Sequence, residues 1–73
     1  MHLWWRLRRL QTPGIPFRVG NRVRLDDPLS GFDQKVGRVM RVEPRQVLVR
    51  FVDWQGSVQT LRSPDRLTFV AER

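Results

Sequence analysis

The sequence has 73 residues, with 14 lysines and arginines against seven acids, a formal net charge of +7 and no cysteine. This length permits one domain with a thin hydrophobic core, and the absence of thiols excludes disulfide bonds, cysteine metal ligands and covalent attachment of a redox group. The single histidine, His2, and the scattered acids form no catalytic or metal-binding constellation, so we expect a protein that is not an enzyme and uses neither metal nor cofactor.

Residues 1–16 differ in composition from the rest of the chain. The apolar residues fit one stripe of a short helix, with arginines on the other sides, and a Pro-Gly pair ends it. So short a helix is marginal alone in water and must pack on the rest of the chain, on a partner or on a membrane surface. Tryptophan beside arginine is typical of interfacial anchors. We therefore expect an amphipathic arm whose tether to a membrane or complex consists of Leu3, Trp4, Trp5 and Leu7.

From residue 17 to residue 73, short strand patterns alternate with turn residues. Val23 and Leu25 alternate with Arg22 and Arg24, which predicts a strand with one buried and one cationic face. A loop follows over residues 26–31, and its two aspartates fit turn chemistry better than metal binding.

The second strand is expected over residues 36–42. Its apolar spacing slips by one residue, which predicts a bulge near Met40-Arg41. After a tight turn at residues 43–45, the clearest strand covers residues 46–53, with Val47, Val49 and Phe51 on one face.

The last third of the chain predicts two more strands. A turn at Gln55-Gly56 precedes a strand over residues 57–61, and residues 67–70 form the fifth strand. Between them, residues 63–66 resemble one helical turn capped by serine, with proline in its first position. The whole pattern predicts an all-β fold, a small five-stranded SH3-like barrel over residues 17–73 that closes by curling, preceded by a short N-terminal helix or arm.

The charge predicts an anionic partner. All the basic residues except Lys35 are arginine, whose guanidinium pairs bidentately with carboxylate or phosphate and suits interfaces better than lysine does. Such a field attracts nucleic acid, an anionic membrane or an acidic protein, and charge alone does not choose among them. No apolar run approaches the roughly 20 residues of a membrane span, so we expect a cytoplasmic or membrane-peripheral protein.

Two resemblances point to different partners. Gly20-Asn21-Arg22-Val23-Arg24 followed by Val36-Gly37-Arg38-Val39 resembles the KOW-type module of ribosomal and transcription proteins, which implies RNA or ribosome binding. The same glycines and valines also serve the structure of many small barrels. RNA binding would need stacking aromatics near the arginines, such as Trp54 or Phe32.

The order of residues over 18–70 resembles the ferredoxin-docking S subunit of the photosynthetic NAD(P)H-dehydrogenase-like complex, and more weakly the small barrel protein of photosystem I that also helps to dock ferredoxin. The shared pattern is a Val-Arg pair, a proline-led loop, residues 37–42, a valine-rich strand ending in Phe51, then Trp54, and an arginine before a final leucine. This resemblance implies an accessory subunit of a larger electron-transfer complex, peripheral on the cytoplasmic or stromal face of the thylakoid membrane. It also implies that the acidic partner is ferredoxin-like and that Arg62 matters most for docking.

We expect the arginines of the strands to project outward together as one cationic patch. The candidate partner-binding residues are Arg22, Arg24, Arg38, Arg41, Arg50, Trp54 and Arg62. Trp54 is either a platform for a ligand or, as we expect, half-buried packing at the rim of the barrel. A remote alternative is an enzyme, because residues 56–59 match four residues of the type II dihydrofolate reductase; the residues that follow the glutamine there are replaced here by Thr60-Leu61.

Overall fold

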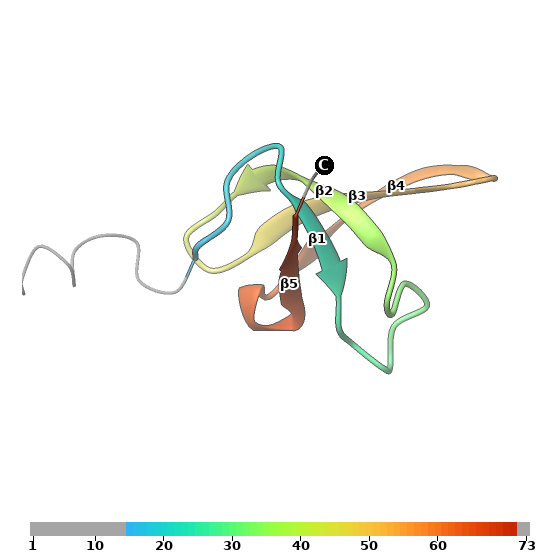
Figure 1. Cartoon of the computed structure of the whole chain (residues 1–73), viewed down its shortest axis with the longest axis horizontal. Helices are drawn as coiled ribbons and strands as arrows, with labels where there is room; N and C mark the ends of the chain where they lie inside the picture. The colour runs from blue at the N-terminus through green and yellow to red at the C-terminus, as the bar shows by residue number, and fades with distance from the viewer. Residues whose placement is uncertain (1–14, 72–73) are drawn as a thin grey trace, which may run out of the picture.

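Five antiparallel strands form a single sheet in the computed structural model, which describes residues 15–71. The strands are β1 (Arg22–Leu25), β2 (Val36–Val42), β3 (Val47–Asp53), β4 (Gly56–Arg62) and β5 (Leu67–Val70), with a 3-10 turn at Pro64–Arg66 before β5. Their order across the sheet is β4-β3-β2-β1-β5 (Figure 1). The predicted all-β fold is therefore confirmed. The predicted helical arm and its tether, Leu3, Trp4, Trp5 and Leu7, lie outside the described residues.

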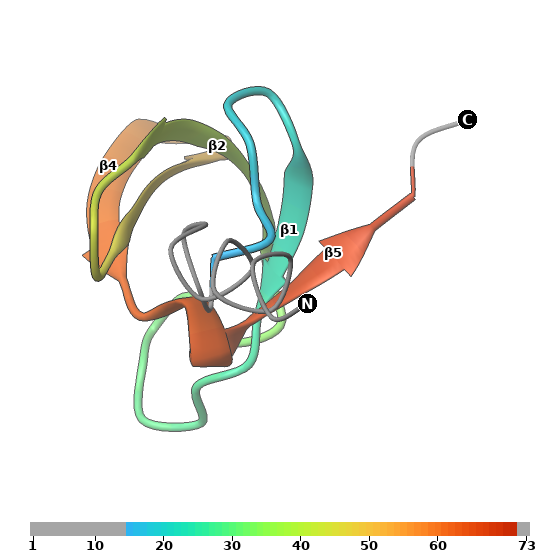
Figure 2. The ribbon, with the colours of Figure 1, turned by 90° about the vertical axis from the view of Figure 1, so that its left-hand side faces the viewer.

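The sheet curls without closing. Figure 2 shows the sheet curling part of the way round, but β4 and β5 are the two ends of the sheet and do not pair with each other. The four residues of β5 pair with β1, and the tip of the β3–β4 hairpin projects away from the other strands (Figure 1). The prediction of a closed barrel is therefore wrong. Within residues 15–71, one edge of β4 and one edge of β5 have no neighbouring strand.

The inner face of the curl holds the hydrophobic core. The fully or nearly buried side chains are Phe17, Val23, Leu25, Val39, Val47, Val49, Phe51 and Leu67. They come from alternate positions of the strands because successive side chains of a strand point to opposite faces. Phe32, from the long loop after β1, stacks on Phe51 with its ring centroid 5.1 Å away. The predicted alternation along β1 and β3 is confirmed.

A bulge in β2 keeps the core continuous. The register between β2 and β3 shifts between Val39 and Arg41, so that Val39 lies opposite Val49 while Val42 lies opposite Val47. One extra residue thus restores the inward phase of Val42 after the bulge. This irregularity lies where the sequence predicted it.

Close approach of β2 to β3 requires glycine at position 37. A Cβ atom added to Gly37 would lie 2.6 Å from the carbonyl oxygen of Arg50, 2.8 Å from Cγ1 of Val49 and 2.9 Å from Cδ1 of Phe51. Any side chain here would therefore push the two strands apart.

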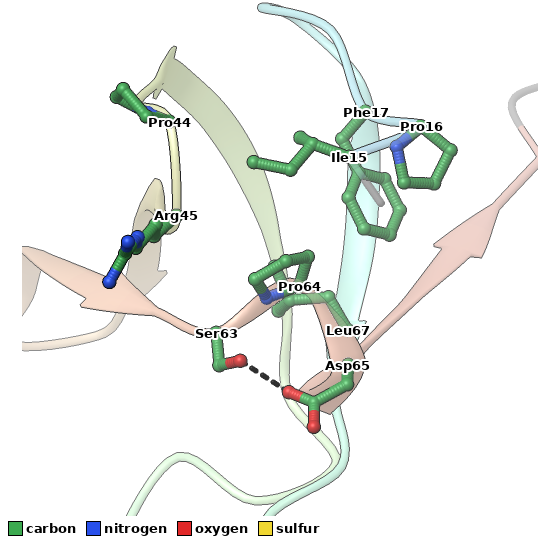
Figure 3. A pocket seen from close by; sticks show the side chains of 9 residues that line it. All are labelled: Ile15, Pro16, Phe17, Pro44, Arg45, Ser63, Pro64, Asp65 and Leu67. Atoms are coloured by element: carbon green, nitrogen blue, oxygen red, sulfur yellow. Dashed lines mark hydrogen bonds between the residues drawn. The ribbon is translucent and has the colours of Figure 1, made fainter. Parts of the chain in front are cut away.

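Two local predictions near the end of the chain need correction. The turn between β3 and β4 consists of Trp54 and Gln55, one residue earlier than predicted, because Asp53 pairs with Gly56. In the 3-10 turn, proline occupies the predicted first position, but Ser63 does not cap a backbone N–H. Its hydroxyl instead donates to the carboxylate of Asp65 (Figure 3). Residues 15–71 contain no helix with the length and apolar character of a membrane span.

Candidate partner-binding surface

Three of the predicted arginines lie side by side across the sheet. Arg22 of β1 lies directly opposite Arg38 of β2, and Arg38 lies directly opposite Arg50 of β3. Residues paired in this way project from the same face with Cβ atoms about 4.5–5.5 Å apart. Because their neighbours Val23, Val39 and Val49 face the core, these three arginines form an arginine row on the outer face.

A shallow hollow accompanies the arginine row. It has a volume of about 270 Å³ and is lined by Arg22, Arg38 and Arg50 together with Val36, Gly37 and Val52. The side chains of Val36 and Val52 are 40% and 67% exposed. The surface therefore combines positive charge with apolar contact area, which is the composition of an arginine-rich protein interface.

The arginines at the two ends of the row, Arg22 and Arg50, form no ion pair with any acid among the described residues. Within residues 15–71, ion pairs are formed by Arg24, Arg41 and Arg62, and none by Arg22 or Arg50. The central residue, Arg38, donates from Nη1 to the carbonyl oxygen of Gly20 over 2.9 Å. Hence Arg22 and Arg50 offer guanidinium groups that an anionic partner can engage.

Arg24 and Arg41 lie on the same face but are paired with neighbouring acids. Nε of Arg24 lies 2.7 Å from Oδ1 of Asp26, and Nη2 of Arg41 lies 2.6 Å from Oε2 of Glu43. The hydrogen bonds from Arg24 and then Thr68 lower the pKa of Asp26 to about 2, and the same carboxylate raises the pKa of Arg24. These two arginines are therefore partly neutralised and contribute less positive charge to a partner-binding surface than the sequence predicted.

Arg62 is not part of the outward surface. It lies opposite Val47, on the inner side of the sheet, and its side chain is 24% exposed. Nη1 lies 3.5 Å from Oδ2 of Asp27, while Nη2 donates to Oγ of Ser30 over 3.3 Å. The prediction that Arg62 is exposed with the other arginines is wrong, because the register of β4 turns this side chain toward the loop after β1. There it fixes that loop to the sheet.

Trp54 also differs from the prediction. It lies in the turn at the tip of the β3–β4 hairpin and is 90% exposed rather than half-buried. The reason is that the tip projects beyond the core (Figure 1). Phe32, the other candidate for stacking on a nucleic-acid base, is engaged with Phe51 inside the curl. Neither aromatic therefore lies in the arginine row.

Of the two aspartates after β1, Asp27 serves the turn as predicted, whereas Asp26 accepts hydrogen bonds from the side chains of Arg24 and Thr68. Oδ1 of Asp27 accepts the N–H of Leu29 over 3.2 Å, and Oδ1 of Asp33 accepts the N–H of Asp27 over 2.8 Å. Such side-chain bonds to the backbone stabilise turns. In the part of the chain from residue 15 to residue 71, no three acidic or histidine side chains gather in a way that would hold a metal ion.

A second hollow lies at the end of the sheet nearest residue 15. It measures about 520 Å³, and Figure 3 shows its walls, which come from three segments: residues 15–17, the Pro44-Arg45 turn and the stretch 63–67. Phe17 and Leu67 belong to both the hollow and the core. This depression is therefore where the hydrophobic core reaches the surface, and it does not include the arginine row.

Some surface residues were not predicted. Val36 and Val52 were not among the predicted partner-binding residues, although their alternation with buried neighbours places them on the same face as the arginines. The acids that pair with Arg24 and Arg41 follow them by two residues, a spacing that puts both side chains on one face of an extended chain. Comparison with known proteins assigns no family: no protein-family model matches the chain, and no curated protein matches it. The two resemblances stay predictions.

Proposed function

We propose that this chain is a non-catalytic docking module that binds an acidic protein through the arginine row. The supporting observation is the register that puts Arg22, Arg38 and Arg50 directly opposite one another. An acidic surface laid over the row would gain charge-assisted hydrogen bonds from Arg22 and Arg50, which form no ion pair within residues 15–71.

The surroundings of the row favour a protein over a nucleic acid. Single-stranded nucleic acids are held by aromatic side chains on which bases stack, beside the cationic groups that contact phosphate. Among the described residues, the row is flanked by Val36 and Val52 instead. Exposed aliphatic side chains around arginines match the apolar contacts of a protein partner.

We further propose that the sheet belongs to the SH3-like class. The strand order β4-β3-β2-β1-β5 and the 3-10 turn before β5 support this assignment. Together with the resemblance to the ferredoxin-docking S subunit, it favours a ferredoxin as the acidic protein and an accessory role in a photosynthetic electron-transfer complex at the thylakoid membrane. In this proposal Leu3, Trp4, Trp5 and Leu7 tether the chain, and electrostatic steering by the row speeds the encounter with the carrier.

Titration of the full chain with two kinds of partner tests this proposal. The protein is titrated with an acidic ferredoxin and separately with a mixed-sequence RNA at about 150 mM salt, where the Debye length is roughly 8 Å. We expect saturable one-to-one binding of the ferredoxin and weaker RNA binding that falls steeply with added salt. Tight RNA binding together with no ferredoxin binding would overturn the proposal in favour of an RNA-binding module.

A further inference from the structure

Within residues 15–71, the edge of β4 that faces away from β3 is long, and its one charged residue, Arg62, lies at the last position of the strand. Natural sheets protect their edges with proline, lysine, bulges or very short edge strands. β4 has 7 residues with the sequence GSVQTLR, which includes neither proline nor lysine, and its register with β3 runs without a shift. All its residues are exposed or half-buried. Figure 1 shows the β3–β4 hairpin projecting beyond the other strands, and β4 is at the end of the strand order.

The hydrogen-bonding pattern of the hairpin fixes which backbone groups of β4 point outward. A two-residue turn makes its flanking residues, Asp53 and Gly56, a hydrogen-bonded pair. Bonded and non-bonded pairs then alternate along an antiparallel ladder. The non-bonded positions of β4 are therefore Ser57, Gln59 and Leu61, whose N–H and C=O groups point away from β3.

These outward groups are in line with the arginine row. Gln59 lies directly opposite Arg50, so the line of paired residues runs from Arg22 through Arg38 and Arg50 to Gln59 and ends at the free edge. A strand added beyond β4 would lie about 4.8 Å further on. Its residue opposite Gln59 would project from the same face as the row, within reach of the extended Arg50 side chain.

We propose that the acidic partner docks through an extended segment that adds to β4 as a further antiparallel strand, with its acidic side chains on the face of the arginine row. This inference rests on the docking function proposed above and specifies how the partner is held. Main-chain hydrogen bonds to the edge supply affinity, and alternate side chains supply specificity, as in other strand-addition complexes.

The other face of the added strand requires apolar residues. Val58 of β4 faces the inner side and is 46% exposed, since its partner Phe51 covers it from one flank only. A residue of the added strand next to the acid opposite Gln59 would lie beside Val58 and bury it. The segment recognised by this edge thus alternates acidic and β-branched apolar residues.

A capped nine-residue peptide of alternating glutamate and valine tests this inference on the full chain. We expect it to bind and to slow amide hydrogen exchange at Ser57, Gln59 and Leu61, with affinity measured by fluorescence anisotropy of the labelled peptide. N-methylation at the glutamates removes the donors that face β4 and should weaken binding at least tenfold. N-methylation at the valines removes donors that face away and should change binding less than twofold. Equal affinity of the two methylated peptides would overturn strand addition.

Variants of the protein separate this inference from the docking function. Gln59→Pro removes one outward N–H and should weaken binding at least tenfold, whereas Gln59→Ala keeps the N–H and should change it less than twofold. If the peptide needs Arg50 but tolerates Gln59→Pro and both methylations, strand addition is wrong and docking by the row stands. If it needs the edge but binds the Arg50→Gln variant unchanged, strand addition stands and contact of the peptide with the row fails; Arg22 lies too far from an added strand to be tested by this peptide.

Discussion

Replacement of Gly37 by alanine tests the packing that brings Arg38 and Arg50 together. The added Cβ would lie within 3.0 Å of three atoms, one of them the backbone carbonyl oxygen of Arg50, which moves only if the strand moves. Overpacking of this kind costs about 1–3 kcal/mol, against a gain of about 0.4–1 kcal/mol from the stiffer unfolded chain. The clash therefore dominates, and we expect Gly37→Ala to destabilise the domain.

Chemical denaturation monitored by circular dichroism gives the free energy of unfolding for this comparison. The matched control is Gly31→Ala, because a Cβ at Gly31 meets no atom within 4 Å and alanine there should leave the stability unchanged or raise it slightly. A small domain loses about 4–8 °C of Tm per kcal/mol, so Gly37→Ala should also melt clearly earlier. Equal or greater stability of Gly37→Ala would refute the close approach of β2 and β3.

Three further changes have defined outcomes. Arg50→Gln removes an exposed guanidinium that forms no ion pair within residues 15–71 and should change the free energy of unfolding by less than about 0.5 kcal/mol; a larger loss of stability would show that Arg50 has a structural role. The pKa of Asp26 is lowered from 3.8 to about 2, so its ionised carboxylate stabilises the fold above pH 4, and this stabilisation is lost as the pH falls toward 2. The difference in Tm between the wild type and Asp26→Asn should therefore narrow between pH 4 and pH 2. A constant difference over this pH range would refute the stabilising role of Asp26. Arg62→Met loses the contacts to Asp27 and Ser30 and should lower the free energy of unfolding by about 1 kcal/mol. The affinity for an acidic protein should change less than twofold. A tenfold loss of affinity would show that Arg62 belongs to the docking surface.

Strand positions and the buried face were predictable because they depend on local alternation. Val23, Val49 and Phe51 follow a period of two, and the bulge near Met40 shows as a break in that period. These features need no knowledge of distant segments. The loop and its turn-forming Asp27 were likewise predictable from the composition of that segment.

The face of a residue on β4 was not predictable in the same way. It depends on the register with β3, and a shift by one residue moves every side chain to the opposite face. The turn was predicted at Gln55-Gly56 but lies at Trp54–Gln55. Arg62 was expected to be exposed, whereas this register turns it inward. Closure of the sheet likewise depends on how β4 and β5 lie in space, which no local pattern determines.

The central claim, that Arg22 and Arg50 hold an acidic protein from the arginine row, is tested most directly by two variants of equal charge. Arg22→Gln with Arg50→Gln lowers the net charge from +7 to +5, and so does Arg45→Gln with Arg66→Gln, whose side chains are exposed outside the row. Calorimetric titration with an acidic ferredoxin should show a Kd at least tenfold higher for the first variant and less than threefold higher for the second. Equal losses in both would mean that overall charge, and not the row, attracts the partner.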